Sequence, residues 1–234
     1  MQIAKNIEII DLCLYLRKEK ILVLADTHIG YEEALNKRGV LIPRFQFKEI
    51  IGRLEKILDK VKPDKIIING DIKHEFGTIS EQEWRHALRL LDFLSKHCKE
   101  IVLIKGNHDT ILGPIAKKRN VKVVDSFKVK DVLILHGHKV PKELKGVKTI
   151  IIGHEHPAVS LKEESRIEIY KCFLKGKFKR KVLIVQPSFN LVTEGTDVLK
   201  EKLLSPFLKQ DLSNFECFIV GDKVYDFGKL KKLI

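Results

Sequence analysis

Cysteine is scarce in this sequence and widely spaced. The four cysteines form no Cys-x-x-Cys pair and stand at Cys13, Cys98, Cys172 and Cys217. This spacing signals neither a zinc knuckle nor a disulfide framework, because both require cysteines at characteristic separations. We expect the cysteines to be reduced packing residues.

Long apolar runs are also absent. No run approaches the roughly 18 apolar residues of a membrane-spanning helix, and the apolar first residues include Glu8 and Asp11 without a small-residue cleavage site. No Pro-, Gly- or Ser-rich linker divides the 234 residues, of which 44% are hydrophobic. Such a chain is long enough to bury one sizeable core. We expect one soluble, cytoplasmic domain over residues 1–234.

Acidic residues are the scarcer of the two charged classes. Lys and Arg number 44 against 31 Asp and Glu, which gives a formal net charge of +13. This excess favours polyanionic partners such as nucleic acid. Lysine-rich, glutamine-poor sequences also arise where stability at high temperature is selected, and that explanation needs no nucleic acid. Composition alone leaves both explanations open.

Strand and helix patterns alternate along the first half of the chain. A hairpin formed by residues 7–16 and 21–25 opens the fold, and a short helix follows near Glu32–Lys37. Pro43 starts a longer helix with an apolar stripe, and the capping box Ser80-Glu-Gln-Glu83 opens another. Such alternation predicts right-handed crossovers and a largely parallel sheet.

Beyond residue 121 the helical pattern fades and short strands follow one another. They are predicted at 121–124, 132–135, 149–152, 166–174, 182–186 and 217–225. We expect these strands to form a sheet that packs on the first. The sequence therefore predicts an α/β fold, a two-sheet β-sandwich flanked by helices.

Polar residues follow the apolar runs directly. The run Ile101–Ile104 leads into Gly106-Asn-His-Asp109, and runs at 22–25, 66–69, 132–135 and 150–152 end similarly. Ligands of α/β folds bind beyond the carboxyl ends of such buried strands, so these polar residues are expected to line one site. Six histidines stand near such ends: His28, His108, His136, His138, His154 and His156.

The spacing of two of these pairs suits metal binding. Asp26 and His28 are two residues apart, and side chains so spaced point to the same side of an extended backbone, where they can bind one ion. The same holds for His154 and His156, although the turn after Gly153 could aim them at different ions. Imidazole and carboxylate without cysteine suit Mn²⁺, Fe²⁺ or Zn²⁺.

Five motifs occur in the order typical of one superfamily. They are Asp26-x-His28, Gly70-Asp71, Gly106-Asn-His-Asp109, His136 and Gly153-His-x-His156. Over residues 22–156 the chain resembles the calcineurin-like metallophosphoesterases, which implies a single domain with four α-β-β-α layers. Residues 70–77 and 187–190 resemble the small archaeal and bacterial branch related to the SbcD nucleases, which includes phosphoesterases associated with DNA ligases.

The resemblance implies two divalent metal ions, with Mn²⁺ expected first and Fe²⁺, Zn²⁺ or Ni²⁺ as alternatives. The ligands would be Asp26, His28, Asp71 and His156 for one ion, and Asp71, Asn107, His136 and His154 for the other. Asp71 would bridge the ions, and a bridging hydroxide would attack phosphorus. His108 would face the substrate and either protonate the leaving alkoxide or stabilise the charge of the phosphoryl group.

One position departs from the family pattern. Many relatives have Gly-Asp-x-x-Asp, whose second aspartate helps to orient the catalytic histidine, whereas this sequence has His74 there. His74 either contacts phosphate or helps to set the choice of substrate, or it is an ordinary loop residue. Asp109 either partners His108 or caps the following turn. We place His138 beside the metal ligands rather than among them.

A basic segment follows the last histidines. Residues 171–181 contain no acidic residue and six basic ones: Lys171, Lys175, Lys177, Lys179, Arg180 and Lys181. With Phe173 and Phe178 between them, a hairpin over about 166–186 could track a phosphate backbone and stack on bases. The alternative is a solvated hairpin whose lysines discourage edge pairing and whose phenylalanines face the core.

These features predict a two-metal phosphodiesterase, a nuclease that acts on DNA ends or single strands with DNA and DNA-repair proteins as partners. The alternative is a phosphoesterase of small molecules or nucleotides. A non-catalytic scaffold is a third class. It is disfavoured because such proteins tend to lose metal ligands or the catalytic histidine, and none is missing here.

Overall fold

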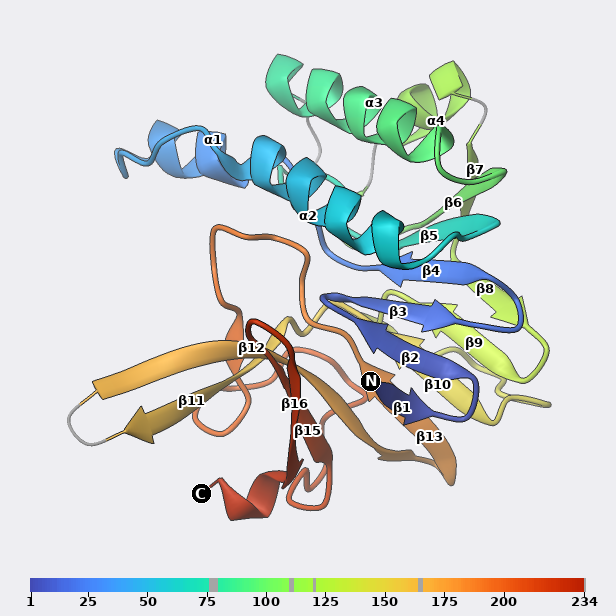
Figure 1. The fold of residues 1–234 in the computed structure, drawn as a ribbon, viewed down its shortest axis with the longest axis vertical. Helices are drawn as coiled ribbons and strands as arrows, with labels where there is room; N and C mark the ends of the chain where they lie inside the picture. The colour runs from blue at the N-terminus through green and yellow to red at the C-terminus, as the bar shows by residue number, and fades with distance from the viewer. Residues whose placement is uncertain (76–79, 110–111, 120, 164–165, 234) are drawn as a thin grey trace.

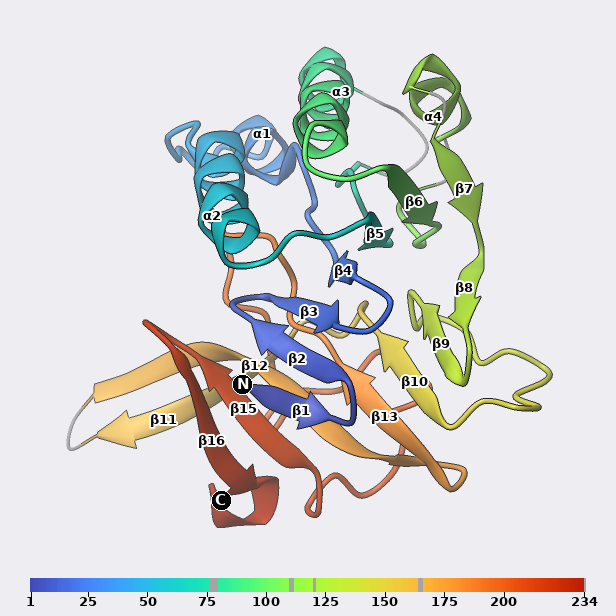
Figure 2. The ribbon, with the colours of Figure 1, turned by 45° about the vertical axis from the view of Figure 1, so that its right-hand side comes forward.

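Two β-sheets packed face to face form the centre of the protein, and the helices lie on the outer face of the first sheet (Figure 1). This computed structural model describes residues 1–75, 80–109, 112–119, 121–163 and 166–233. The turned view also places the helices on the outer face of the first sheet (Figure 2). They are α1 (Tyr31–Lys37), α2 (Gln46–Lys60), α3 (Glu81–Ser95) and α4 (Gly113–Arg119). The predicted two-sheet α/β sandwich is confirmed.

The first sheet combines an antiparallel meander with a parallel half. Its strands, in spatial order, are β1 (Gln2–Ala4), β2 (Ile7–Ile10), β3 (Cys13–Leu16), β4 (Ile21–Leu24), β5 (Lys65–Asn69), β6 (Glu100–Ile104) and β7 (Lys122–Val124). Strands β1 to β4 pair antiparallel, so the predicted opening hairpin is part of a longer meander. Strands β4 to β7 pair parallel, as the alternation of strands and helices predicts.

The starts of the two long helices follow from side chains that pair with their first amides. Ser80 accepts a hydrogen bond from the Glu83 backbone, and the Glu83 carboxylate accepts one from the Ser80 backbone, so the predicted capping box is confirmed. Helix α2 begins at Gln46 rather than at Pro43, because the buried Glu32 carboxylate accepts the backbone N–H groups of Phe45 and Gln46.

The second sheet holds the later strands. They are β8 (Ser126–Val129), β9 (Val132–Leu135), β10 (Thr149–Ile152), β11 (Pro157–Glu163), β12 (Arg166–Phe178), β13 (Lys181–Val185), β14 (Thr196–Asp197), β15 (Glu216–Val220) and β16 (Val224–Lys229). The segment predicted as one strand at 217–225 belongs to the β15–β16 hairpin, since residues 221–223 turn the chain. Strands β8, β11 and β14 were not predicted. Strands β11 and β12 form an arm that projects from the body (Figure 1).

Alternating side chains of the second sheet build two cores. Ile134, Ile151 and Ile184 pack with the strands and helices of the first sheet. Their neighbours Ile150 and Leu183 face outward and pack under the segment 198–215. Burial on both faces explains why these strands read as continuous apolar runs. The outer layer over the second sheet is built from loops rather than from the helices that cover the first.

The loops that follow the parallel strands meet at one edge of the sandwich. Asp26 and Gly70, which follow β4 and β5, share a backbone hydrogen bond, and the His154 amide donates to the Asp26 carboxylate across the two sheets. Polar strand ends from both sheets are therefore brought together. No helix of the described residues is long and apolar enough to cross a membrane.

Candidate metal centre

The structure gathers all seven side chains expected to bind metal at this edge. They follow the ends of β4 (Asp26 and His28), β5 (Asp71), β6 (Asn107), β9 (His136) and β10 (His154 and His156). Two groups of possible ligand atoms result, each with its atoms within 4.8 Å of one another. The predicted convergence of the strand ends is thus what the fold produces.

The first group is formed by Asp26, His28 and His156. The Nε2 atoms of His28 and His156 are 3.2 Å apart, and His156 Nε2 lies 3.7 Å from Asp26 Oδ1. Asp26 and His28 are buried. A cation between these atoms would be coordinated by the lone pairs of both Nε2 atoms and of Asp26 Oδ1, which otherwise repel one another.

The second group is formed by Asp71, His136 and His154. His136 Nε2 lies 3.1 Å from His154 Nδ1, 3.3 Å from Asp71 Oδ2 and 2.9 Å from Asn107 Oδ1. The same Asp71 oxygen is 3.8 Å from His28 Nε2 in the first group. Asp71 therefore stands between the groups, where a ligand shared by two cations would stand.

Buried atoms of this centre fit bound cations. Among the described residues, Asp26 Oδ1, which faces the first group, is buried without a hydrogen-bond partner. Buried polar atoms of native proteins are rarely left unpaired, and a bound cation pairs with the lone pairs of a carboxylate directly. The donor set combines carboxylate, imidazole and one amide oxygen without sulfur, which suits Mn²⁺, Fe²⁺ or Zn²⁺.

The surroundings of the centre shift the pKa values of its histidines. Burial and the neighbouring His136 lower the pKa of His154 to about 4, and burial with the nearby His156 lowers that of His28. Both rings are therefore neutral near pH 7, as a metal ligand must be. Burial raises the pKa of the Asp71 carboxyl, but the hydrogen bond to His136 and the surrounding imidazoles outweigh it and hold the pKa below its usual range.

Five of the expected ligands have backbone φ angles in the left-handed region: Asp26, His28, Asp71, His154 and His156. The extended geometry assumed for the Asp26–His28 pair is therefore wrong, and turns rather than strand alternation bring these side chains together. Non-glycine residues in this region cost of order 1–3 kcal/mol each and cluster at functional sites. His154 and His156 fall in different groups, as the turn after Gly153 allows.

Two motif glycines are required by close approach. A Cβ on Gly70, whose φ is +82°, would lie 2.0 Å from His136 Nδ1. A Cβ on Gly106 would lie 1.9 Å from Asp71 Oδ1. The glycines in these motifs therefore let the ligand side chains pack directly against neighbouring backbone.

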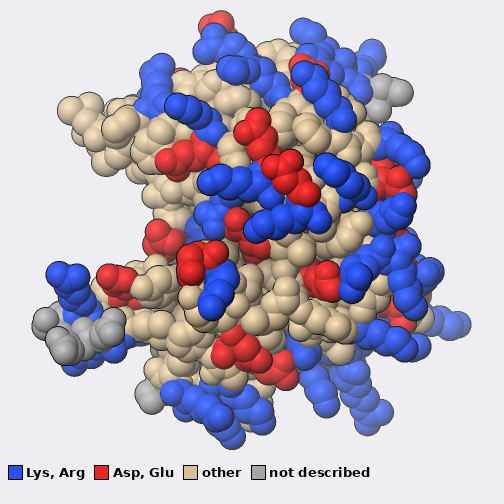
Figure 3. Space-filling view, viewed as in Figure 1, with Lys and Arg blue, Asp and Glu red and all other residues tan. Residues whose placement is uncertain are grey.

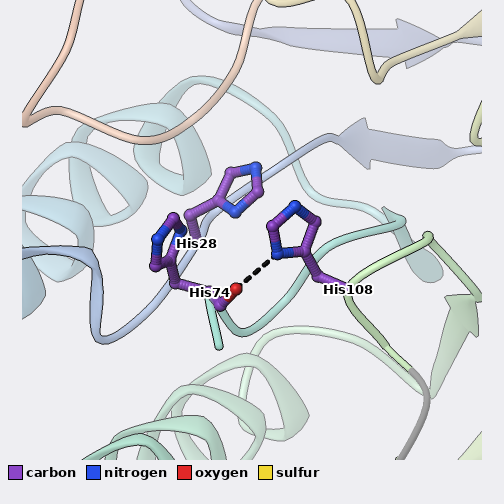
Figure 4. A group of neighbouring side chains, drawn as sticks. All are labelled: His28, His74 and His108. Carbon is purple, nitrogen blue, oxygen red and sulfur yellow. Dashed lines mark hydrogen bonds between the residues drawn. The ribbon is translucent and has the colours of Figure 1, made fainter. Parts of the chain in front are cut away.

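The ring of His108 is held beside the first group by a backbone carbonyl (Figure 4). Its Nδ1 forms a hydrogen bond with the carbonyl oxygen of His74, and a carbonyl only accepts, so Nδ1 carries the proton. His28, His74 and His108 form a third group of close ring nitrogens. The His74 backbone thus occupies the orienting position expected for a second aspartate.

The loop that carries His74 is fixed by the cap of α3. Glu83 Oε1 accepts hydrogen bonds from the backbone N–H groups of His74 (3.1 Å) and Glu75 (2.8 Å). The His74 ring packs edge-on against Tyr31, with ring centroids 4.5 Å apart. Burial and the nearby His108 lower the pKa of His74 to about 4, so this ring is neutral near pH 7.

Asp109 and His138 both lie beside the expected ligands. Asp109 is buried and ties two loops together, since its oxygens accept the backbone N–H groups of Ile72 (3.1 Å) and Gly106 (3.0 Å). Burial and the charge of Asp71 raise its pKa to about 7. The ring centroid of His138 is 5.2 Å from that of His136.

The basic segment does not form the surface that its sequence suggested. Lys171 is buried, Phe173 lies in the core, and Lys175 pairs with Glu216 at 2.8 Å. Lys181 Nζ donates to the Val147 carbonyl at 2.6 Å. Exposed basic side chains remain at Lys177, Lys179 and Arg180.

The turn at residues 179–180 also lies away from the metal centre. It precedes β13, which runs parallel to β10, whereas His154 follows the carboxyl end of β10. The turn and the metal centre are therefore at opposite ends of this sheet. Lys and Arg are spread over the face in Figure 3 rather than gathered on one element, so net charge alone does not select a binding face.

Sequence reasoning assigned no chemistry to two polar residues that support the centre. Gln46 Nε2 donates to the His28 carbonyl (3.0 Å) and to Asn190 Oδ1 (3.1 Å). The backbone N–H of Asn190 donates to the Asp26 carbonyl (3.1 Å). Residues 187–190 carried part of the family resemblance, which was a sequence signal for Asn190, whereas no signal pointed to Gln46. Both residues brace the loop that bears Asp26 and His28.

Lys171 holds the next part of the same segment. Its Nζ donates to Ser188 Oγ (2.9 Å) and to the carbonyls of Thr193 (2.7 Å) and Glu194 (3.1 Å). The loop ends against the metal centre, where the Thr196 amide donates to the His156 carbonyl (2.9 Å). Lys171 therefore anchors the loop that contains Ser188, Thr193 and Glu194, and it is too buried to contact nucleic acid.

Known proteins share this fold and these motifs. Residues 19–158 match the family described as calcineurin-like phosphoesterase, and the chain belongs to this family. Its members are hydrolases with a dinuclear metal site, which the two groups of ligand atoms fit. No protein with a curated description matches the sequence.

Solved structures resemble the chain to different degrees. The Pseudomonas putida nuclease MPE has a TM-score of 0.68 at 20% identity, with 94% of this chain and 93% of that one covered. Yfce, a phosphoesterase from E. coli, has a TM-score of 0.43 at 10% identity, with 90% and 97% covered. At such identities the similarity to the nuclease shows a common fold.

Metal affinity is expected to rise with pH. Burial opposes charge on His136, but the hydrogen bond to Asp71 and the nearby Asp26 raise its pKa to about 9 in the metal-free protein. A cation must displace this proton, so the affinity for Mn²⁺ should increase up to tenfold per pH unit below about pH 9 and level off above it. Calorimetric titration in buffers of different ionisation enthalpy measures the released proton. Binding near pH 7 without proton release would contradict this assignment.

Lys171→Met is expected to lower the melting temperature. The substitution keeps the length of the side chain but leaves the Ser188 hydroxyl and two carbonyls without their donor. Each buried polar group left unpaired costs roughly 1–3 kcal/mol. Thermal unfolding compares this variant with Lys177→Met, which alters an exposed lysine of the same strand. Equal melting temperatures for both variants would show that the hydrogen bonds of Lys171 contribute nothing to stability.

Proposed function

We propose that this phosphoesterase is a nuclease that hydrolyses phosphodiester bonds at DNA ends or in single strands with two Mn²⁺ ions. The observation that carries the proposal is the position of His108, held by the His74 carbonyl beside the joined groups of ligands. The alkoxide that leaves from a nucleic-acid diester needs a proton donor at this position. DNA ends and single strands are substrates of repair, which is the proposed setting.

Two further features support a nucleic-acid substrate. The net charge of +13 favours approach of a polyanion. The Pseudomonas putida nuclease MPE shares the fold over 94% of this chain. Neither feature carries the proposal alone, because charge does not select a face and a shared fold supports several activities.

The chain supplies two sets of ligands that share Asp71. Asp26, His28, Asp71 and His156 would hold one cation, and Asp71, Asn107, His136 and His154 the other. When bound, two divalent cations supply Lewis-acid activation of the phosphoryl group and of the attacking water. The protein keeps these ligands in place through buried hydrogen bonds to the surrounding loops.

His108 performs the proton transfer in this proposal. The bond from Nδ1 to the His74 carbonyl fixes the plane of the ring, and Nε2 points away from that carbonyl, where the proposal places the substrate. In the protonated ring, Nε2–H donates to the bridging oxygen of the scissile bond and passes its proton as that bond breaks. The His108 backbone amide donates to Asp71 Oδ1 at 2.9 Å, which couples the position of the acid to the shared ligand.

The purified protein with Mn²⁺ is expected to prefer diesters. Hydrolysis of bis-p-nitrophenyl phosphate should exceed that of p-nitrophenyl phosphate at least tenfold, and labelled single-stranded DNA should be cut faster than duplex. EDTA should abolish each activity, because both ligand groups then lack cations. Activity confined to monoesters or small nucleotides would instead support a small-molecule phosphoesterase and exclude the nuclease.

His108→Ala is expected to lower cleavage of DNA about 10²–10⁴-fold, the usual contribution of a positioned proton donor. The loss on bis-p-nitrophenyl phosphate should be smaller, because p-nitrophenolate leaves without a proton. His97→Ala, which alters an exposed histidine after α3, is the matched control. Elemental analysis should find both cations retained in the His108 variant. Loss of a cation would reassign His108 to metal binding.

A further inference from the structure

A hollow of about 920 Å³ lies beside the second group of ligands. We call it the flank pocket, and its inner wall includes His136, Gly106 and Asp109. It is also lined by Asp125 and Ser126, where β7 leads into β8, and by residues 137–142. The volume falls in the range of small-molecule and nucleotide sites, about 300–1,000 Å³. It thus borders residues of the metal centre.

The rim of the flank pocket is basic. Lys105, Lys139 and Lys142 line it, and Lys139 and Lys142 are exposed. Within the described part of the chain, these two lysines have no carboxylate partner within 4.0 Å. Lys105 Nζ is 3.5 Å from Asp125, but Asp125 has 90% of its side chain exposed, so the pair is weak and easily exchanged for another anion.

The floor of the flank pocket is apolar. It is lined by aliphatic side chains: Leu112, Val123, Leu135, Val140 and Pro141. A site for the bare phosphoryl group would need only charged or hydrogen-bonding groups. Apolar side chains together with exposed lysines instead match a nucleotide unit, whose sugar and base are largely apolar on their faces and whose phosphates are anionic.

His138 lines the flank pocket next to the metal centre. Its ring centroid is 5.2 Å from that of the expected ligand His136. Its Nδ1 is buried and has no hydrogen-bond partner among the described residues. A buried polar atom without a partner is expected to be paired in the functional state, so it can meet a sugar or phosphate oxygen of a bound chain.

We propose that the flank pocket binds the nucleotide next to the scissile phosphate of a single-stranded polynucleotide, with Lys105, Lys139 and Lys142 on the neighbouring phosphates. This inference rests on the proposed nuclease function and names the strand path for it. The path runs from the metal centre over His138 to the lysine rim. It replaces the remote turn at residues 179–180 as the contact for the phosphate backbone.

The test compares two triple variants of equal charge. Lys105→Ala/Lys139→Ala/Lys142→Ala alters the flank pocket, and Lys177→Ala/Lys179→Ala/Arg180→Ala alters the turn at the opposite end. Binding of a fluorescent single-stranded oligonucleotide is measured by anisotropy in the Mn²⁺-loaded His108→Ala background at several salt concentrations. Cleavage of the oligonucleotide and of bis-p-nitrophenyl phosphate is measured in the otherwise unmodified protein.

The flank-pocket variant should bind the oligonucleotide at least tenfold more weakly, and the slope of log affinity against log salt should fall by about 2, since each contact to single strands contributes about 0.7. Its loss of oligonucleotide cleavage should exceed its loss on the small diester at least tenfold. The turn variant should match the parent protein in both measurements.

The two proposals fail in different ways. If both triple variants weaken binding equally, or if neither weakens it, the flank-pocket proposal is overturned. Cleavage of DNA by the unmodified protein would still uphold the nuclease. Oligonucleotide binding that depends on the flank pocket, without any cleavage by the unmodified protein, would overturn the nuclease and retain the pocket. Failure of the parent protein to bind the oligonucleotide at all would overturn both.

Discussion

The buried carboxylate of Asp71 is the interaction on which the rest of the site depends. One of its oxygens lies 3.8 Å from His28 Nε2 and 3.3 Å from His136 Nε2, so it touches both ligand groups. The other accepts the His108 backbone amide. Burying an unpaired carboxylate costs several kcal/mol. The imidazoles of His28 and His136, the backbone N–H of His108 and, when bound, the cations offset that cost because they lie next to the Asp71 oxygens. The loops after β5, β6 and β9 must therefore approach one point.

That approach strains the backbone, and polar contacts from the helical layer hold it. Left-handed turns at the ligands persist because their surroundings over-determine them. Gln46 at the start of α2 braces the His28 loop, and Glu83 at the start of α3 fixes the loop of His74. The helix starts that set the fold thus also set the site. In the described ranges the four α-helices cover the first sheet, where these contacts are made.

Local signals in the sequence explain which parts could be predicted. Each expected ligand follows an apolar run, so grouping at one edge follows from strand order alone. Contacts between distant segments leave no such signal. The bond from His108 to the His74 carbonyl joins residues 34 apart, and the partners of Lys171 lie beyond the next strand. The hairpin lies where the sequence predicts it, but local composition shows only that Lys171 is basic and not that it is buried.

A carbonyl in place of a carboxylate behind His108 also has a physical consequence. Asp26, Asp71 and Asp109 already place three buried carboxyl groups within these loops, and the raised pKa of Asp109 reflects burial and the charge of Asp71. A further aspartate at position 74 would add to that desolvation cost. The His74 carbonyl directs the ring without adding charge, and Glu83 keeps the carbonyl in place through the backbone. Orientation of the proton donor is thereby separated from the charge balance that the cations must satisfy.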